Sequence, residues 1–152
     1  MVDIINVGAQ APDFKLKDQN GKEVTLSEFR GKKVLLSWHP LAWTSVCTDQ
    51  MRALDREYDK FAEKNTVVLG LSVDPQPSKS AWAKALCLSK LPVLADFHPL
   101  GEVANAYGIF SDMYGASKRA NILVGEDGNV IWAKKYEIPQ LPDLDEVFAQ
   151  LF

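Results

Sequence analysis

Two largely apolar runs separated by a helical stripe constrain the fold of this 152-residue chain more than any other feature. The runs occupy residues 34–38 and 66–73, and short apolar runs of this kind are typical of strands buried on both faces. Between them, four apolar side chains recur at helical spacing from Met51 to Phe61, which predicts one long amphipathic helix over residues 48–64. A strand, a helix and a second strand in this order predict a parallel pair joined by a crossover helix, and therefore an α/β fold.

Turn residues predict two antiparallel additions to this unit. Asn20-Gly21 lies between two alternating segments and predicts an N-terminal β-hairpin closed by a type I′ turn. Asp127-Gly128 predicts a second hairpin near the end of the chain. We therefore expect a single domain over residues 1–152, built as a central mixed β-sheet flanked by helices.

Composition and charge exclude several classes of protein. The chain is 47% hydrophobic and 24% charged, which excludes disordered and collagen-like chains. The net charge is −3 and the basic residues are scattered, so nucleic acid is not expected as a partner. No apolar run is long enough to span a membrane, and Asp3 stands where a secretory signal would carry a basic residue. We expect a cytoplasmic protein without a membrane partner.

The chain contains two cysteines, Cys47 and Cys87. They are too few and too far apart for a secreted disulfide framework, and they lack the short spacing of a zinc site. A metal site assembled from these thiols, His39 and His98 has the right residue types but no ligand spacing, so no metal is expected. Cys47 lies at the start of the long predicted helix, where free backbone N–H groups and the helix dipole favour a thiolate. Taken alone, a cysteine of this kind is more often a buried structural residue than a reactive one.

Pro40, Thr44 and Cys47 stand in the spacing Pro-x-x-x-Thr-x-x-Cys, directly after the first predicted buried strand. This motif resembles the active site of the peroxiredoxins, the cysteine-based peroxidases, and Arg119 resembles the distant arginine of that family. The resemblance extends over nearly the whole chain, and segments such as 106–110 look most like the alkyl hydroperoxide reductase E-like or bacterioferritin-comigratory-protein-like branches. It implies a thioredoxin-like fold and a thiol-dependent peroxidase that reduces hydrogen peroxide and organic hydroperoxides without a cofactor.

The resemblance also implies a role for each residue of the motif. The Cys47 thiolate would attack the peroxide and become a sulfenic acid. Pro40 would shield this thiolate from water, and the Thr44 hydroxyl would donate to the thiolate and accept from the peroxide. The backbone amides of Val46 and Cys47 and the guanidinium of Arg119 would stabilise the charge that moves as the O–O bond breaks. Without the motif, Arg119 would be taken for a solvated surface arginine.

Three residues depart from the pattern of the family. His39 stands where many relatives have an aromatic residue, Trp43 where phenylalanine is common, and Gln50 where glutamate is often found. His39 places a titratable ring near Cys47, although packing at a strand end is the commoner role of such a residue. Trp43 is expected either at an apolar substrate mouth or in the contact of a homodimer, which the resemblance also implies.

Cys87 is the only internal thiol that can close the catalytic cycle. Ser78 predicts the start of a helix over residues 79–89, and Cys87 lies more than about 90° from the centre of its apolar face. We therefore predict that Cys87 resolves the Cys47 sulfenic acid as an intramolecular disulfide. A helix end would have to unwind, because the two Cα atoms must come within about 7 Å. If Cys87 is a spectator, the chain is a one-cysteine peroxiredoxin that an external thiol resolves.

Two further functions belong to other classes. A disulfide reductase of the thioredoxin type shares the fold but needs Cys-x-x-Cys, and Gln50 occupies the second cysteine position. A redox-regulated sensor or holdase, in which oxidation of Cys47 changes assembly, remains open. For the peroxidase, the expected partners are the hydroperoxide and a thiol reductant such as thioredoxin, glutaredoxin or a low-molecular-weight thiol.

Overall fold

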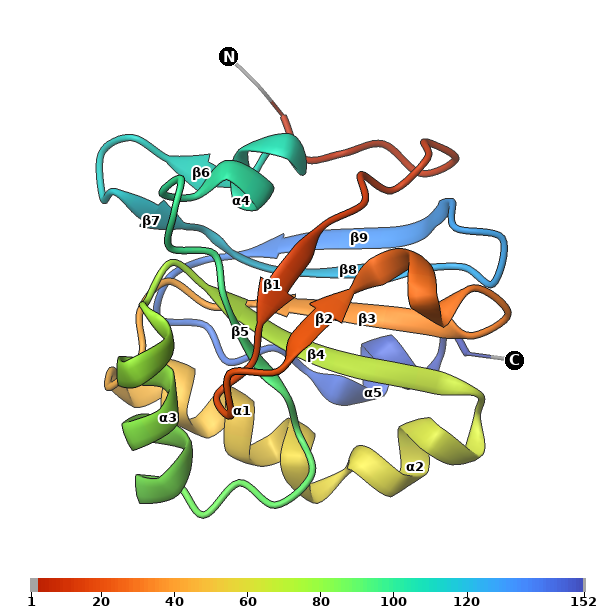
Figure 1. Ribbon diagram of the computed structural model, residues 1–152. Coiled ribbons are helices and arrows are strands. Elements are labelled where there is room, and N and C mark those ends of the chain that lie inside the picture. The colour runs from red at the N-terminus through yellow and green to blue at the C-terminus, as the bar shows by residue number, and fades with distance from the viewer. Residues whose placement is uncertain (1–2, 152) are drawn as a thin grey trace.

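A mixed sheet of seven strands forms the centre of the molecule (Figure 1). The computed structural model describes residues 3–151. The strand order is β2-β1-β5-β4-β3-β8-β9, in which β5, β4 and β3 are parallel and all other neighbours are antiparallel. The strands of this sheet are β1 (Lys15–Lys17), β2 (Glu23–Thr25), β3 (Lys33–Trp38), β4 (Thr66–Ser72), β5 (Val93–Ala95), β8 (Arg119–Val124) and β9 (Val130–Tyr136), and β6 (Phe110–Ser111) and β7 (Ala116–Ser117) form a separate pair.

Both faces of the sheet are covered. Figure 1 shows α1, α2, α3 and α5 below the sheet and α4 with the β6–β7 pair above it. The helices are α1 (Ser45–Arg56), α2 (Tyr58–Glu63), α3 (Gln76–Ala85), α4 (Glu102–Ala106), α5 (Leu144–Phe148) and the 3₁₀ turn η1 (Leu26–Phe29). One buried apolar cluster lies on the side of α1 and α3 and includes Met51 and Trp82, and the other includes Trp38 and Tyr107. The predicted mixed sheet flanked by helices is confirmed.

The register between β3 and β8 places polar side chains on the face of the sheet that α1 covers. Ser37 pairs with Asn121, and Leu35 pairs with Leu123. Because side chains alternate between the two faces of a strand, Arg119 lies on the same face as Asn121 and Leu123. Ser37 and Asn121 are fully buried and Arg119 is nearly so, so these polar groups must find their partners inside the protein.

The helices differ from the sequence prediction in two places. The single helix predicted over residues 48–64 is two helices, α1 and α2, which are separated by Glu57 with a ψ of 8°. Periodicity could not reveal this break, because the apolar stripe continues across it and stays buried in one cluster. The helix predicted over residues 79–89 begins earlier, with Pro75 as its N-cap in place of Ser78, and ends at Ala85.

Both predicted hairpins are present, but the first does not have the predicted type I′ turn geometry. Gly21 and Gly128 have positive φ, whereas the residues before them do not. In the first hairpin the Asp18 carboxylate accepts hydrogen bonds from the backbone N–H groups of Asn20 and Lys22. A side chain that bonds its own turn in this way supports a longer loop, so the two-residue turn is replaced.

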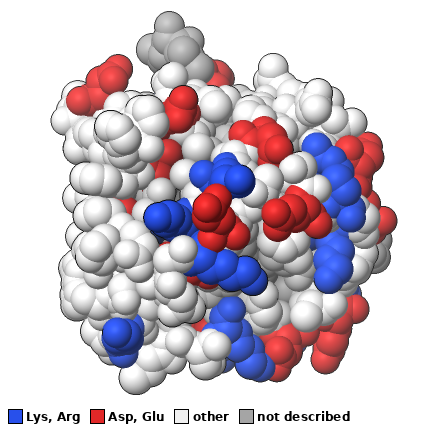
Figure 2. Space-filling view, in the orientation of Figure 1, with Lys and Arg blue, Asp and Glu red and all other residues white. Residues whose placement is uncertain are grey.

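Acidic and basic side chains are interspersed on the surface that Figure 2 shows. Several of them pair across elements, such as Lys15 with Glu23 and Lys134 with Glu146. Among residues 3–151, no helix is long and apolar enough to cross a membrane.

Candidate active site

Cys47 lies in the first turn of α1, directly after the loop that leaves β3. Its side chain is fully buried and its thiol is free. The first residues of a helix have no intrahelical acceptor for their N–H groups, and Thr44, the N-cap, does not cap them with its side chain. The backbone N–H groups of Ser45, Val46 and Cys47 therefore converge on one place with the positive end of the helix dipole.

Arg119 reaches Cys47 from the neighbouring part of the sheet. Its Nη1 lies 3.3 Å from the Cys47 Sγ, although the two residues are far apart in the sequence. Nε and Nη2 donate to the carbonyl of Ile138 at 3.1 and 2.8 Å, which fixes the plane of the guanidinium. Arg119 is only 2% exposed, so its charge acts on the sulfur with little screening by water.

Gln50 holds the guanidinium from the other side. Its Oε1 accepts from Arg119 Nη1 at 2.6 Å, and its Nε2 donates to Ser37 Oγ and to the Trp38 carbonyl. Ser37 in turn donates to Asn121. The whole chain of hydrogen bonds is buried, so each group depends on its neighbours for its partners. Where glutamate would neutralise Arg119, Gln50 accepts the same hydrogen bond and leaves the positive charge in place.

The loop before α1 has a fixed shape. The Ala42 N–H donates to the Asp74 carboxylate, and Trp43 adopts a left-handed backbone with a φ of 73°. The Thr44 hydroxyl donates to the Leu41 carbonyl at 2.8 Å, so its proton is engaged by this backbone group. Its oxygen lone pairs remain free to accept a hydrogen bond.

A pocket of about 390 Å³ opens over the sulfur. Pro40, Thr44, Val46, Cys47 and Arg119 all line it, so the structure brings these predicted site residues together. The other lining residues are mostly apolar: Leu41, Ser45, Tyr114, Ala116, Ile138 and Pro139. Trp43 does not line the pocket, and its side chain is 57% exposed on the loop beside it.

His39 and Lys79 form a buried pair next to this site. Lys79 Nζ lies 2.7 Å from His39 Nε2, and neither side chain is exposed. Burial, followed by the nearby charges of Lys79 and Arg119, lowers the pKa of His39 well below its usual value, so the ring is neutral. Burial also lowers the pKa of Lys79 to about 7, while the charges of Asp74 and Cys47 favour its protonated form.

Cys87 is not brought to the site. It lies two residues beyond the end of α3, is exposed, and lines a separate pocket with Asn20 and Lys84. Its N–H donates to the Lys84 carbonyl, the next N–H donates to Ala83, and its φ is 56°. These are the bonds of a Schellman motif, in which glycine is the usual left-handed residue. Cys47 and Cys87 are both free thiols.

Two groups in or beside the site were missed by sequence analysis. The Ile138 carbonyl gives no signal in a sequence, because it acts through its backbone. Lys79 did give one, since Lys79, Trp82 and Leu86 follow one another at spacings of 3 and 4, which places a lysine on the apolar stripe of its helix. Among residues 3–151, no three or more His, Cys, Asp or Glu side chains are grouped so that they could hold a metal ion.

Known sequences resemble this chain over most of its length. Residues 7–133 match the AhpC/TSA family. Alkyl hydroperoxide reductase E of Mycobacterium tuberculosis is 37% identical over 141 residues, which cover 92% of each chain. Peroxiredoxin Bcp of Bacillus subtilis is 30% identical over 135 residues, which cover 86% of each chain.

Solved structures resemble the whole architecture. The reduced 2-Cys peroxiredoxin of Plasmodium vivax superposes with a TM-score of 0.85 at 32% identity, over 94% of this chain and 78% of that one. Peroxidoxin BcpB of Mycobacterium tuberculosis superposes with a TM-score of 0.84 at 25% identity, over 96% of each chain. The expected thioredoxin-like fold is therefore confirmed.

Proposed function

Since the chain belongs to the AhpC/TSA family of peroxiredoxins and is a thiol-dependent peroxidase, we propose that Cys47 is the sulfur that attacks the hydroperoxide. The observation that carries this proposal is the 3.3 Å contact between Arg119 Nη1 and Cys47 Sγ at the N-terminus of α1. Two independent sources of positive potential, a guanidinium and a helix N-terminus, meet at this thiol. Cys87 has neither, since it is exposed beyond the C-terminus of its helix.

In the proposed reaction, the Cys47 thiolate attacks the terminal oxygen of the peroxide. The S–O bond forms as the O–O bond breaks, which gives a sulfenic acid on Cys47 and leaves an alkoxide or hydroxide that takes a proton from solvent. Arg119 lies close enough to stabilise both the sulfur and the departing oxygen. The free N–H groups of Val46 and Cys47 supply further donors at the same place.

The position of Thr44 refines the role that the sequence predicted for it. Because its hydroxyl proton is engaged by the Leu41 carbonyl, we assign Thr44 as an acceptor for the peroxide O–H, which orients the peroxide along the line of attack. Pro40 lines the same pocket and has no N–H that would bind water there. The mostly apolar pocket wall supports organic hydroperoxides as substrates besides hydrogen peroxide.

We propose that Cys87 then closes the cycle as the resolving cysteine. In α3 the rise of about 1.5 Å per residue separates the two ends of the helix by roughly 15 Å. Cys87 follows the C-terminal end of α3, whereas the N-terminal end of α3 is the one that lies near the start of α1. The last turn of α3 must therefore unwind before a disulfide can form. The left-handed backbone of Cys87 favours this step, because unwinding releases a conformation that a non-glycine residue adopts at a cost.

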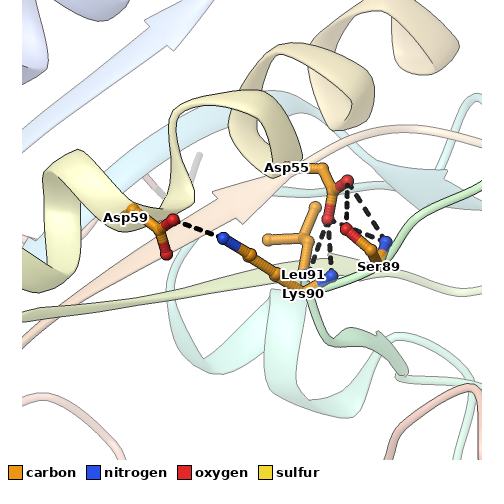
Figure 3. A network of polar contacts seen from close by, with 5 residues as sticks. All are labelled: Asp55, Asp59, Ser89, Lys90 and Leu91. Atoms are coloured by element: carbon orange, nitrogen blue, oxygen red, sulfur yellow. Dashed lines mark hydrogen bonds and ion pairs between the residues drawn. The ribbon is translucent and has the colours of Figure 1, made fainter.

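A second cluster of hydrogen bonds restrains that unwinding from the C-terminal side. Figure 3 shows the Asp55 carboxylate of α1 accepting from the backbone N–H groups of Ser89, Lys90 and Leu91. Burial opposes the charge of this carboxylate, but the N–H donors prevail and lower its pKa. Lys90 also pairs with Asp59. The segment after Cys87 is thereby anchored to α1, so the mobile part would be the end of α3 itself.

The test is to count thiols and measure intact mass after one equivalent of peroxide. Cys47→Ser should abolish peroxidase turnover, and full activity in this variant would refute the assignment. Wild type should lose two hydrogens on a monomer-sized species, whereas Cys87→Ser should retain the sulfenic acid and over-oxidise with excess peroxide. If wild type accumulates sulfenic acid while Cys87 still reacts with an alkylating agent, the chain is a one-cysteine peroxidase.

We also propose that the chain forms a homodimer through the exposed apolar residues beside the pocket. Trp43, Met113 and Tyr114 are all more than half exposed. They belong to two different loops that contribute residues to the pocket wall. The physiological reductant would be a dithiol protein or a low-molecular-weight thiol that reaches the exposed Cys87. Light scattering should give twice the mass of the chain, and Trp43→Glu should give the monomer mass if this surface is the contact.

A further inference from the structure

We propose that Lys79 is a positioning residue of the peroxidase, a second buried cation besides Arg119 whose charge stabilises the Cys47 thiolate and is stabilised by it. The proposal rests on the assignment of Cys47 as the reactive sulfur. It goes beyond the motif residues, because Lys79 belongs to α3 and its Nζ makes its hydrogen bond with His39 alone among residues 3–151.

The setting of Lys79 is unusual for a lysine. Its side chain has no exposed surface, and its Nζ lies 5.4 Å from the centre of the Trp82 ring. Neither His39 nor the indole carries a negative charge, and Lys79 makes no ion pair with the described carboxylates. A buried ammonium without a counter-charge is costly, so its protonation depends on negative charge nearby.

His39 determines how the ammonium is held. Because the ring is neutral, its Nε2 can accept a hydrogen bond from the protonated Lys79 in the tautomer that carries its proton at Nδ1. Nδ1 has no partner within the described residues. The charge of Arg119 also acts on His39, so a protonated ring would be repelled by two cations. The neutral ring binds one ammonium without adding a third charge to the site.

Two groups can supply the missing negative charge, Asp74 and Cys47. Asp74 precedes α3, and its carboxylate is already bonded to the Ser72 hydroxyl and to the Ala42 N–H of the active-site loop. Cys47 belongs to the same buried cluster as Trp82, the residue over which Lys79 lies. Unlike Asp74, Cys47 changes charge during the reaction, because the thiolate becomes a neutral sulfenic acid.

Linkage makes the proposal testable in both directions. If the thiolate favours the protonated Lys79, then the protonated Lys79 must favour the thiolate by the same free energy. With Cys87 replaced by serine, the thiolate absorbance at about 240 nm reports Cys47 alone. Lys79→Met should raise the midpoint pH of this titration by roughly half a unit or more, which is about a threefold loss of thiolate below the midpoint. The matched control, Lys84→Met, removes an exposed lysine of the same helix and should leave the midpoint unchanged.

The rate of peroxide reduction gives a reading that a merely structural defect would not. Lys79→Met should slow the reaction at low pH in proportion to the lost thiolate and approach the wild-type rate at high pH, where Cys47 is fully ionised. An equal loss at every pH would show only a distorted site and would overturn the proposal. Equal midpoints for Lys79→Met and Lys84→Met would overturn it as well.

The reciprocal measurement does not depend on whether Lys79→Met folds. Carbon-13 NMR of lysine ε-carbons should show one resonance that titrates near neutral pH, and its midpoint should fall in Cys47→Ser, where no thiolate can form. If the midpoint falls in Asp74→Asn but is unchanged in Cys47→Ser, the partner of Lys79 is Asp74 and the proposal is wrong. Neither NMR outcome requires peroxidase activity, so the proposed function is judged separately by the turnover of Cys47→Ser.

Discussion

Arg119→Met is the substitution that tests the electrostatic argument most directly. Methionine fills much of the same buried volume, but it removes the donor that lies 3.3 Å from the Cys47 Sγ. The loss of one preorganised donor to developing charge costs about 10²–10³ in rate, or ~2.7–4 kcal/mol. We therefore expect the second-order rate constant for peroxide to fall by at least about 10²-fold.

The free energy of unfolding of this variant should fall by no more than its activation free energy rises. Gln50 Oε1 is buried and loses its donor, which costs ~1–3 kcal/mol. The Ile138 carbonyl also loses its donors, but Ile138 is 39% exposed and water can replace them. Urea unfolding should show a loss of ~1–3 kcal/mol, partly offset because a buried charge is removed.

The assay is the stopped-flow reaction of reduced protein with hydrogen peroxide and with an alkyl hydroperoxide. Arg52→Met is the matched control, because Arg52 is an exposed arginine on α1. If Arg119→Met reacts within threefold of wild type while Arg52→Met is unchanged, the guanidinium does not stabilise the transition state. A rate loss that disappears under strongly stabilising conditions would refute the argument equally, because it would arise from unfolding.

Three further predictions follow from other parts of the structure. Thr44→Val should slow the same reaction by about 10²-fold and leave urea unfolding within ~0.5 kcal/mol of wild type, and an unchanged rate would remove Thr44 from the mechanism. Burial raises the pKa of Asp96 to about 6 from 3.8, so the folded state binds this proton more tightly and folding stability falls as pH rises between these two values. Asp96→Asn should flatten that part of the curve of unfolding free energy against pH, measured by urea unfolding. A slope like that of wild type would show that Asp96 is not the origin of the pH dependence. Asp55→Ala frees the segment after Cys87 and should speed disulfide formation, followed by quenched alkylation and mass; an unchanged or slower rate would show that release of this anchor is not needed.

Much of the fold was predictable because its strands and helices are recorded in local periodicity. The buried run before His39 is β3, and the run after residue 65 is β4. The helix break at Glu57 left no trace, because both halves bury the same stripe. The first hairpin turn was predicted in place but not in type, since the Asp18 carboxylate bonds to the loop in a way that a dipeptide signal does not contain.

The site was predictable only where its residues are neighbours in the sequence. Pro40, Thr44 and Cys47 follow one another on one loop and helix, so their spacing is visible directly. Arg119 was found through resemblance, whereas its contact with Cys47 depends on the register of β3 with β8, which no local signal fixes. The direction of the Thr44 hydroxyl depends on the Leu41 carbonyl, a backbone group whose position only the folded loop determines.

Lys79 shows why a charged residue on an apolar stripe deserves a structural explanation before it is assigned to solvent. Lysine is almost never fully buried unless it is paired. The spacing from Lys79 to Trp82 nevertheless places this lysine on the apolar face of its helix, where burial is expected. The fold gives the buried ammonium a hydrogen-bond partner by placing the neutral His39 ring against it. A hydrogen bond to a neutral ring does not balance a charge, however, and the two groups that can supply a negative charge to Lys79 are Asp74 and Cys47. In the proposed reaction Cys47 is charged only until its thiolate becomes a sulfenic acid, so our proposal ties the charge of a residue outside the motif to the state of this sulfur.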